Sequence, residues 1–255
     1  MEEKNKEENN KEEKNKLEEK NKLCLPQGNF IFSYAWQKEY LLLAGGREPN
    51  YAWLRHTTAG RKLWAIDHGL EVARRNNFLP QLILGDGDSC RPDVWEWGKS
   101  LAVPRLTFPR AKDYTDTQLA LTELARADRM GFAVLTGIFG GRFDHAFSTV
   151  FSAAHADVNC ALADEQEIIV FVRTEQKVCF RLEEKQSPPS AVSLLPLDEQ
   201  AVGITTDGLL WPLTDAALTI NNPNTVSNEM TGKEFSLSVK KGRLAVYLYF
   251  GAVSP

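Results

Sequence analysis

Cysteine is scarce in this chain of 255 residues, which contains only Cys24, Cys90, Cys160 and Cys179. These residues lie far apart in the sequence, so they form no Cys-x-x-Cys pair, and the four histidines do not complete a zinc-like pattern. A structural zinc site and a disulfide framework are therefore disfavoured. We expect free thiols in a reducing compartment.

The sequence also lacks long hydrophobic runs and an excess of positive charge. Lys plus Arg number 30 and Asp plus Glu 34, which gives a formal net charge of −4. The apolar run Leu244–Phe250 falls short of the roughly 18 residues of a membrane span, and no apolar signal-peptide core is present. We expect a cytoplasmic protein that binds neither nucleic acid nor membranes.

The first 23 residues hold eight Glu and seven Lys and almost nothing apolar. Variants of EEKNK repeat at Glu2–Lys6, Glu12–Lys16 and Glu18–Lys22, without the apolar stripe of a coiled coil. We predict that residues 1–25 form a disordered or solvated Glu/Lys-rich tail, in preference to an interaction segment.

Residues 26–165 alternate short apolar runs with helical periodicity, the pattern of β-α units on a parallel sheet. The predicted strands are Tyr40–Ala44, Leu63–Ile66, Gln81–Leu84, Arg105–Phe108, Ala133–Thr136 and Cys160–Ala163. The predicted helices are Tyr51–Ala59, Leu70–Asn76, Asp93–Leu101, Thr117–Asp128 and His145–Ala156. This half is therefore expected to be an α/β domain with a parallel sheet.

Residues 166–255 contain short β-rich runs separated by Pro and Gly turns, with no convincing helix. The predicted strands are Ile168–Arg173, Lys177–Leu182, Ala191–Pro196, Ala201–Thr206, Ala216–Ile220, Glu234–Val239 and Arg243–Phe250. Seven such strands predict an all-β C-terminal sandwich domain.

Polar or Gly-rich turns follow several of the predicted parallel strands. They are Ala44–Glu48, Asp67–Gly69, Gly85–Ser89 and Thr136–Asp144. Ligands of open α/β sheets bind outside the carboxyl ends of the strands, so we expect these turns to share one crevice.

Asp86 and Asp88 flank a glycine in the turn GDGDS. In an extended turn, residues i and i+2 point the same way, so both carboxylates can reach one hard cation. The alternative is that Asp-Gly-Asp-Ser is simply a favourable turn sequence.

Asp113 and Asp116 stand three residues apart before an apolar-periodic helix, with Lys112 beside them. Thr115 or Asp116 is the expected N-cap, and the helix start would turn backbone donors toward an anion. Lys112 is placed where a phosphate clamp would be needed. Plain helix capping and a solvated lysine are the alternatives.

The segment TGIFGGRFDH combines glycines, among them Gly140 and Gly141, with Arg142 and Asp144. Glycines let a backbone approach phosphate closely, and arginine supplies permanently charged planar donors. The segment matches neither the Walker A nor the GxGxxG pattern. A structural ion pair between Arg142 and Asp144 is the alternative.

These clusters, without a Ser-His-Asp order or a cysteine nucleophile, favour metal-assisted handling of a nucleotide polyphosphate. Composition and spacing do not say which phosphate moves. The motifs GDGDS, KDYTD, GGRFDH, SLLPL, DGLLWPL and VSN follow one another in the order seen in thiamine pyrophosphokinases, and the chain resembles that family from Tyr40 to Phe250.

The resemblance implies a Rossmann-like nucleotide domain, a C-terminal β-sandwich and a homodimer. It also implies transfer of a diphosphoryl group from ATP to the hydroxyl of thiamine, giving thiamine diphosphate and AMP. By the same resemblance, Asp86, Asp88 and Asp116 look like the Mg²⁺ and polyphosphate site, with Asp113 and Lys112 beside them. The other nucleotide-site positions implied are Asp67, Arg142, Asp144, Gly140 and Gly141, and the thiamine-side positions are Trp211, Ser227 and Asn228.

Two positions depart from the family pattern. His68 stands where the family often has glycine, and Gly87 stands where it often has an aromatic residue, a change that we expect to loosen the loop. Trp211 has a structural alternative as a core tryptophan of the β domain. Two functional alternatives are a diphosphokinase for another hydroxymethylated heterocycle, such as a pterin, and a catalytically silent nucleotide-binding regulatory protein.

Overall fold

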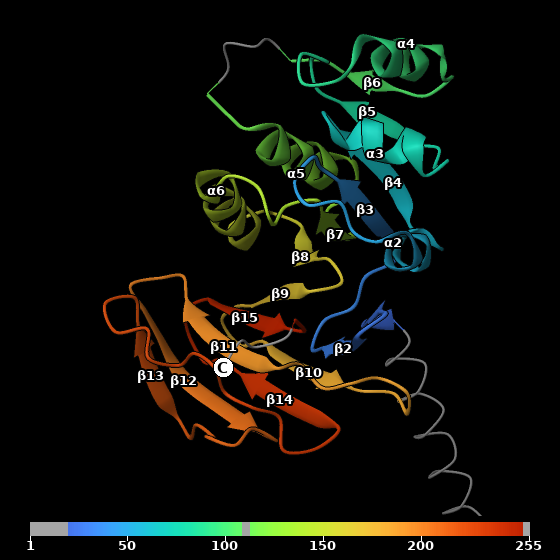
Figure 1. Ribbon diagram of the computed structural model, residues 1–255. Coiled ribbons are helices and arrows are strands. Elements are labelled where there is room, and N and C mark those ends of the chain that lie inside the picture. The colour runs from blue at the N-terminus through green and yellow to red at the C-terminus, as the bar shows by residue number, and fades with distance from the viewer. Residues whose placement is uncertain (1–19, 109–112, 252–255) are drawn as a thin grey trace, which may run out of the picture.

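The computed structural model describes residues 20–108 and 113–251 (Figure 1). The strands are β1 (Lys22–Leu25), β2 (Gly28–Phe32), β3 (Glu39–Leu43), β4 (Lys62–Ile66), β5 (Leu82–Leu84), β6 (Arg105–Leu106), β7 (Phe132–Thr136), β8 (Asn159–Ala163), β9 (Glu167–Val172), β10 (Lys177–Arg181), β11 (Ala191–Pro196), β12 (Gln200–Asp207), β13 (Ala216–Thr219), β14 (Glu234–Ser238) and β15 (Leu244–Tyr249). The helices are α2 (Tyr51–Thr58), α3 (Gly69–Arg75), α4 (Pro92–Ser100), α5 (Asp116–Ala127) and α6 (Phe143–Ala154).

Six neighbouring strands of the nine-stranded sheet run parallel, in the order β8-β7-β3-β4-β5-β6. Strand β7 is buried along its whole length, as expected for a parallel strand covered on both faces. The predicted parallel sheet is therefore confirmed. The strand order reverses between β3 and β7, and ligands of open α/β sheets bind at such a switch point.

Helices cover both faces of the parallel strands. Leu41 and Leu43 of β3 belong to the same buried cluster as α2 and α3, whereas Leu42 belongs to the cluster of α5 and α6. Because side chains alternate across a strand, these clusters lie on opposite faces of the sheet. The carboxyl ends of the strands therefore remain the accessible edge of this layer.

Among residues 166–251 the structure has strands and no helix, as predicted, but this half is joined to the first half by a shared sheet. Strands β9, β15 and β11 extend the parallel strands in antiparallel fashion, through pairs such as Ala161↔Val170. Strands β10, β12, β13 and β14 belong to the six-stranded sheet, of order β1-β2-β10-β14-β12-β13. The division of the chain at residues 165 and 166 stays a prediction.

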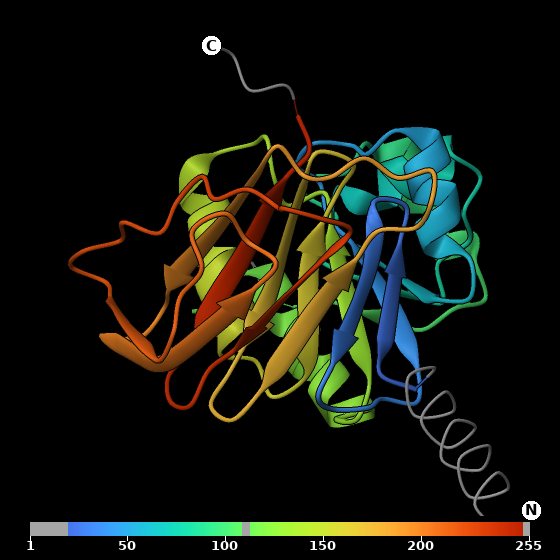
Figure 2. The ribbon, with the colours of Figure 1, turned by 90° about the horizontal axis from the view of Figure 1, so that it is seen from below.

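The hairpin β1–β2 lies at the edge of the six-stranded sheet, beside β10 (Figure 2). Residues 1–19 of the predicted tail lie outside the described residues. For Lys22–Leu25 the tail prediction is wrong, because Leu23 and Leu25 are buried in the core between the sheets. These two apolar side chains alternate along β1, which pairs with Gly28–Phe32.

None of the four cysteines, all of them within the described part of the chain, forms a disulfide, which confirms the expectation of thiols. Within that same part, no helix has the length and apolar character needed to cross a membrane.

Candidate functional site

A cavity of about 440 Å³ lies where the strand order reverses, at the carboxyl ends of β3, β4 and β7. Its walls come from the turn after each of these strands and from the first residues of α5 and α6. Among the predicted site residues, Asp67, Asp116, Gly141 and Arg142 line it. The turn after β5 also contributes Ser89 to the wall, so the shared crevice predicted from the four turns is confirmed.

The turns after β3 and β7 touch through their backbones. The Gly46 N–H donates to the Gly137 carbonyl at 2.6 Å. A Cβ on Gly46 would lie 2.6 Å from that oxygen, and Gly137 adopts a φ of +70°. Side chains at these two positions would force the turns apart, which explains the glycines.

Helix α5 places Asp116 at the cavity. Thr115 is the N-cap: its side chain accepts the Gln118 N–H at 3.2 Å, and the Gln118 side chain accepts the Thr115 N–H at 2.9 Å. This capping box fixes the helix start, so that Asp116 lies in the first turn. Asp113 is exposed and is not among the described residues that line the cavity. Lys112 lies outside the described residues.

Arg142 lines the cavity as the N-cap of α6, with its guanidinium ion-paired to Asp144. Arg142 Nε donates to Asp144 Oδ1 at 3.1 Å, and this pairing holds the pKa of the Asp144 carboxyl below its usual range. The ion pair named as the structural alternative is therefore present, although Arg142 also lines the cavity. Of the described residues around the cavity, neither Asp144 nor Gly140 forms part of the wall.

Asp67 connects the cavity to the GDGDS turn. A Cβ on Gly85 would lie 1.9 Å from Asp67 Oδ1, so the carboxylate rests against the Gly85 backbone. The Cys90 thiol donates to the Asp67 carbonyl at 3.0 Å, and burial raises the pKa of this thiol to about 12. Asp67 therefore lies directly beside the chain that carries Asp86.

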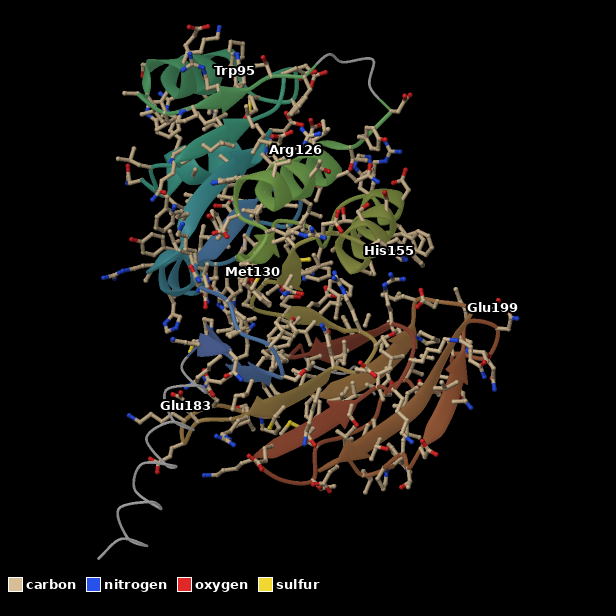
Figure 3. The ribbon with its side chains drawn as sticks, turned by 180° about the vertical axis from the view of Figure 1, so that it is seen from behind. Trp95, Arg126, Met130, His155, Glu183 and Glu199 are labelled. Carbon is tan, nitrogen blue, oxygen red and sulfur yellow. The ribbon has the colours of Figure 1, made fainter. Side chains whose placement is uncertain are left out.

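A hydrogen bond within the GDGDS turn joins its two aspartates. The Asp88 N–H donates to Asp86 Oδ1 at 3.0 Å, as in an Asx turn. Neither carboxylate is among the described residues lining the cavity. A Cβ on Gly87 would lie 2.5 Å from the indole of Trp95, the α4 residue labelled in Figure 3, so glycine lets this ring pack on the turn, and the expected loosening of the loop stays a prediction.

The predicted metal ligands Asp86, Asp88 and Asp116 do not form a ready-made cluster. Among residues 20–108 and 113–251, no group of three or more His, Cys, Asp or Glu side chains is arranged to hold a metal ion. The donor set nevertheless fits Mg²⁺, which prefers oxygen ligands and is usually held by one or two carboxylates plus substrate phosphates. Asp116 and Asp67 are the carboxylates at the cavity.

A second cavity, of about 820 Å³, lies in the β-rich half and is lined by Trp211, Ser227 and Asn228. Trp211 is 58% exposed, so its interpretation as a core tryptophan is wrong. No charged side chain occurs among the described residues that line this cavity, and none of them also lines the first. The structure therefore brings the predicted site residues together in two separate groups.

The amide of Asn228 holds the backbone of Trp211. Its Oδ1 accepts the Trp211 N–H at 3.1 Å, and its Nδ2 donates to the Trp211 carbonyl at 2.8 Å. The Asn228 backbone is in turn fixed to the edge of β11 by two hydrogen bonds with Val192, at 2.7 and 2.8 Å. Asn228 thus fixes Trp211 to the sheet.

Gly45, Gly46, His68 and His145 also line the first cavity, and the sequence prediction assigned them no role. Gly45 and Gly46 could have been predicted as lining residues, because they lie in the AGGRE turn directly after a predicted parallel strand. His68 Nδ1 lies 3.3 Å from the Ser89 carbonyl, and a Cβ on Gly45 would lie 2.5 Å from His68 Cβ. The histidine therefore fits only because residue 45 is glycine.

Comparisons with known proteins agree with this arrangement. Residues 56–163 match the family model "Thiamin pyrophosphokinase, catalytic domain", and residues 177–244 match "Thiamin pyrophosphokinase, vitamin B1 binding domain". Thiamine pyrophosphokinase of Bacillus subtilis is 26% identical over 208 residues, covering 80% of this chain and 94% of that protein. Thiamine pyrophosphokinase 1 of Arabidopsis thaliana is 25% identical over 191 residues, covering 69% and 71%.

Solved structures show the same fold. The crystal structure of thiamine pyrophosphokinase from Bacillus subtilis superposes with a TM-score of 0.72 at 22% identity, covering 84% of this chain and 100% of that one. Thiamin pyrophosphokinase from Candida albicans gives a TM-score of 0.69 at 15% identity, covering 84% and 90%.

Proposed function

Because the chain belongs to the thiamin pyrophosphokinase family, we propose that it transfers a diphosphoryl group from ATP to the hydroxyl of thiamine, giving thiamine diphosphate and AMP. One observation carries the proposal. Apart from Ala44, Gly45 and Gly46, the residues that line the cavity at the switch point lie within the part matched by the catalytic model, and Trp211, Ser227 and Asn228 lie within the part matched by the vitamin B1 model.

The first cavity suits the polyphosphate of ATP. Glycine turns allow close backbone approach, and the first turns of α5 and α6 direct the positive ends of two helix dipoles toward it. Arg142 adds a permanent positive charge at its rim. We also interpret the parallel half as Rossmann-like, since its cavity lies where the strand order reverses.

In the proposed reaction, the thiamine hydroxyl oxygen attacks the β-phosphorus of ATP, and the bond from that phosphorus to the α,β-bridging oxygen breaks. AMP leaves with this oxygen. Asp116 lines the cavity, whereas Asp86 and Asp88 are not among its described lining residues, so we assign Asp116 as acceptor of the hydroxyl proton. Bound Mg²⁺ would neutralise phosphate charge, with Asp116 and Asp67 as its protein ligands and Asp86 and Asp88 nearby.

The second cavity suits thiamine. The thiazolium ring carries a permanent positive charge, and the exposed indole of Trp211 offers it a π face. The cavity is uncharged, so the apolar and aromatic surface would provide most of the affinity. A homodimer is part of the proposal, because the two cavities share no described residue and a second chain can bring one to the other. A cytoplasmic location also stays a prediction.

The test is to incubate the purified protein with ATP, Mg²⁺ and thiamine and to identify both products by chromatography. We expect AMP and thiamine diphosphate in equal amounts, and no reaction when a chelator removes the metal. ADP would indicate transfer of a single phosphoryl group. If thiamine is not converted but a hydroxymethylated pterin is, the protein is a diphosphokinase for another heterocycle. If neither is converted, the result favours a catalytically silent nucleotide-binding protein.

A further inference from the structure

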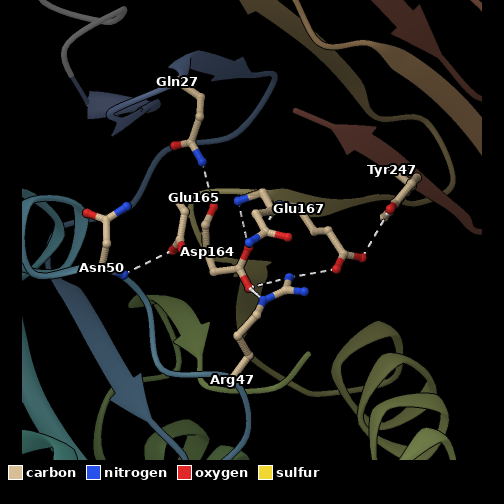
Figure 4. Close-up of polar contacts among 8 residues, drawn as sticks. Gln27, Arg47, Asn50, Asp164, Glu165, Glu167 and Tyr247 are labelled. Atoms are coloured by element: carbon tan, nitrogen blue, oxygen red, sulfur yellow. Dashed lines mark hydrogen bonds and ion pairs between the residues drawn. The ribbon is translucent and has the colours of Figure 1, made fainter. Parts of the chain in front are cut away.

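Arg47, directly after the two glycines of the β3 turn, reaches a buried carboxylate (Figure 4). Its Nε and Nη2 donate to Asp164 Oδ2 at 2.8 and 2.6 Å, and Nη2 also donates to Glu167 Oε1 at 2.6 Å. The Asp164 side chain is 1% exposed, and its Oδ1 accepts the N–H groups of Gln166 and Glu167. A buried charge is thus fully compensated in the turn between β8 and β9.

The contacts continue into the β-rich half. Glu167 Oε2 accepts the Tyr247 O–H at 3.0 Å, and burial together with Glu167 raises the pKa of Tyr247, so its proton stays available for donation. Tyr247 in β15 lies opposite Ser193 in β11, whose Oγ accepts the Ser227 N–H at 3.1 Å. Ser227 lines the second cavity. One set of contacts therefore links the β3 turn to the sheet that supports that cavity.

The same residue ties the two glycine-rich turns of the first cavity. The Arg47 N–H donates to the Phe139 carbonyl at 2.6 Å, next to the bond between Gly46 and Gly137. A Cβ on Gly140 would lie 2.7 Å from Arg47 Cβ, so the side chain is packed directly on the β7 turn. Moving Arg47 would move both turns.

Arg47 is unsuited to bind phosphate itself. Burial disfavours its charged form, but the hydrogen bonds to Glu167 and Asp164 outweigh this and raise the pKa of the guanidinium. Two carboxylates already neutralise that charge, and Arg47 is not among the described residues lining the cavity. Its effect on a nucleotide must therefore pass through the turns.

We propose that Arg47 is a positioning residue that holds the Gly45–Gly46 turn against the Gly137–Gly141 turn by anchoring to Asp164 and Glu167, and thereby sets the affinity of the cavity for ATP. This inference rests on the proposed function only in taking ATP as the ligand of the cavity.

The test measures ATP binding to the full chain by calorimetry, with Mg²⁺ and without thiamine, so that no turnover is needed. Arg47→Met should raise the Kd for ATP about 10-fold and speed amide hydrogen exchange at residues 46 and 47. Arg47→Lys, with one ammonium group in place of the forked guanidinium, should recover less than half of the affinity that Arg47→Met loses.

Arg47→Met leaves Asp164 buried without its cation, which can unfold the protein. The double variant Arg47→Met/Asp164→Asn also removes the buried charge of Asp164, while Glu167, which is 20% exposed, keeps its hydrogen bond from Tyr247. Its Tm should recover toward the wild-type value, while the Kd for ATP stays raised. A recovered Tm with wild-type affinity would overturn the proposal.

Arg61 provides the matched control. Its side chain is 5% exposed and paired with Glu39 at 2.7 Å, at the amino end of β4 and so at the opposite edge of the sheet from the cavity. Arg61→Met should lower the Tm but change the Kd for ATP less than twofold, and an equal loss of affinity in both variants would contradict a specific role for Arg47. If the wild type binds ATP but makes no thiamine diphosphate, the proposed function fails and the comparison of Kd values still decides this inference.

Discussion

The two cavities differ in how they are built. The cavity at the switch point has charged residues on the turns after parallel strands and at the starts of α5 and α6. The cavity of the β-rich half has no charged side chain among its described lining residues and presents an exposed indole on a loop between β12 and β13. This difference fits the proposal that phosphate chemistry and recognition of a flat cation are divided between the two halves of one chain.

The largest effect is expected at the charged cavity. Asp116→Asn should lower kcat/KM by about 100-fold or more, because an amide can replace neither the carboxylate charge at a hard cation nor the proton acceptor. The Tm should change by only a few degrees, since asparagine is tolerated in the first helical turn. Steady-state kinetics and thermal unfolding measure the two quantities.

Asp113→Asn is the matched control for Asp116→Asn, because Asp113 is exposed and stands only three residues away. We expect less than a threefold change in kcat/KM. Equal losses in both variants would show that the acidic segment acts through its overall charge, and the assignment of Asp116 would then be wrong.

A smaller effect is expected at the uncharged cavity. Trp211→Ala should raise the KM for thiamine by about 3- to 30-fold, which corresponds to a cation–π and stacking contribution of roughly 0.5–2 kcal/mol. The Kd for ATP and the Tm should hardly change, because the indole is exposed. Leu210→Ala, at an exposed neighbour outside the described cavity wall, should leave the KM unchanged. If Trp211→Ala also weakened ATP binding, the proposal that the two halves bind the two substrates separately would be wrong.

Asn228→Ala should raise the KM for thiamine less than Trp211→Ala does, by about 2- to 5-fold, because it releases the Trp211 backbone but leaves the indole in place. The effect should vanish when Trp211 is already alanine, since Asn228 then has no ring to position. A double-mutant cycle on the KM measures this coupling, and additive effects would mean that Asn228 contacts thiamine directly.

The smallest effect concerns one thiol in each region. Burial raises the pKa of Cys90 in the first half to about 12, whereas Cys24 in the six-stranded sheet is exposed. Alkylation of the native protein at pH 8 should therefore label Cys24 first, and Cys90 only after unfolding. Because the unfolded thiol ionises at a lower pH than the folded one, Cys90 should make unfolding easier as the pH rises from about 9 toward 12. Peptide mapping by mass spectrometry identifies which thiol has been alkylated. Labelling of Cys90 in the native protein would contradict this expectation.

The sequence predicted more of the first cavity than of the second, for a physical reason. Parallel strands all end at one edge, so the turns at Ala44–Glu48, Asp67–Gly69 and Thr136–Asp144 could be placed together without knowing any contact. The burial of Leu23 and Leu25 in β1 depends on pairing with Gly28–Phe32 and, through β2, on β10, and nothing in the local pattern announces it.

The second cavity could be foreseen only through the family resemblance. Trp211 follows two leucines and precedes proline, which is compatible with either a buried or an exposed ring. Its exposure depends on Asn228, 17 residues later, and on the pairing of Asn228 with Val192. The contact between Gly87 and Trp95 also depends on how a neighbouring helix, α4, packs on the turn.

The central claim is that a diphosphoryl group moves as a unit from ATP bound in the charged cavity to thiamine. The most direct test uses ATP labelled in the γ-phosphate or in the α-phosphate, with thiamine and Mg²⁺. The account predicts that thiamine diphosphate carries the γ label and that the α label stays in AMP. A γ label recovered in thiamine monophosphate together with ADP, or an α label in the thiamine product, would contradict it.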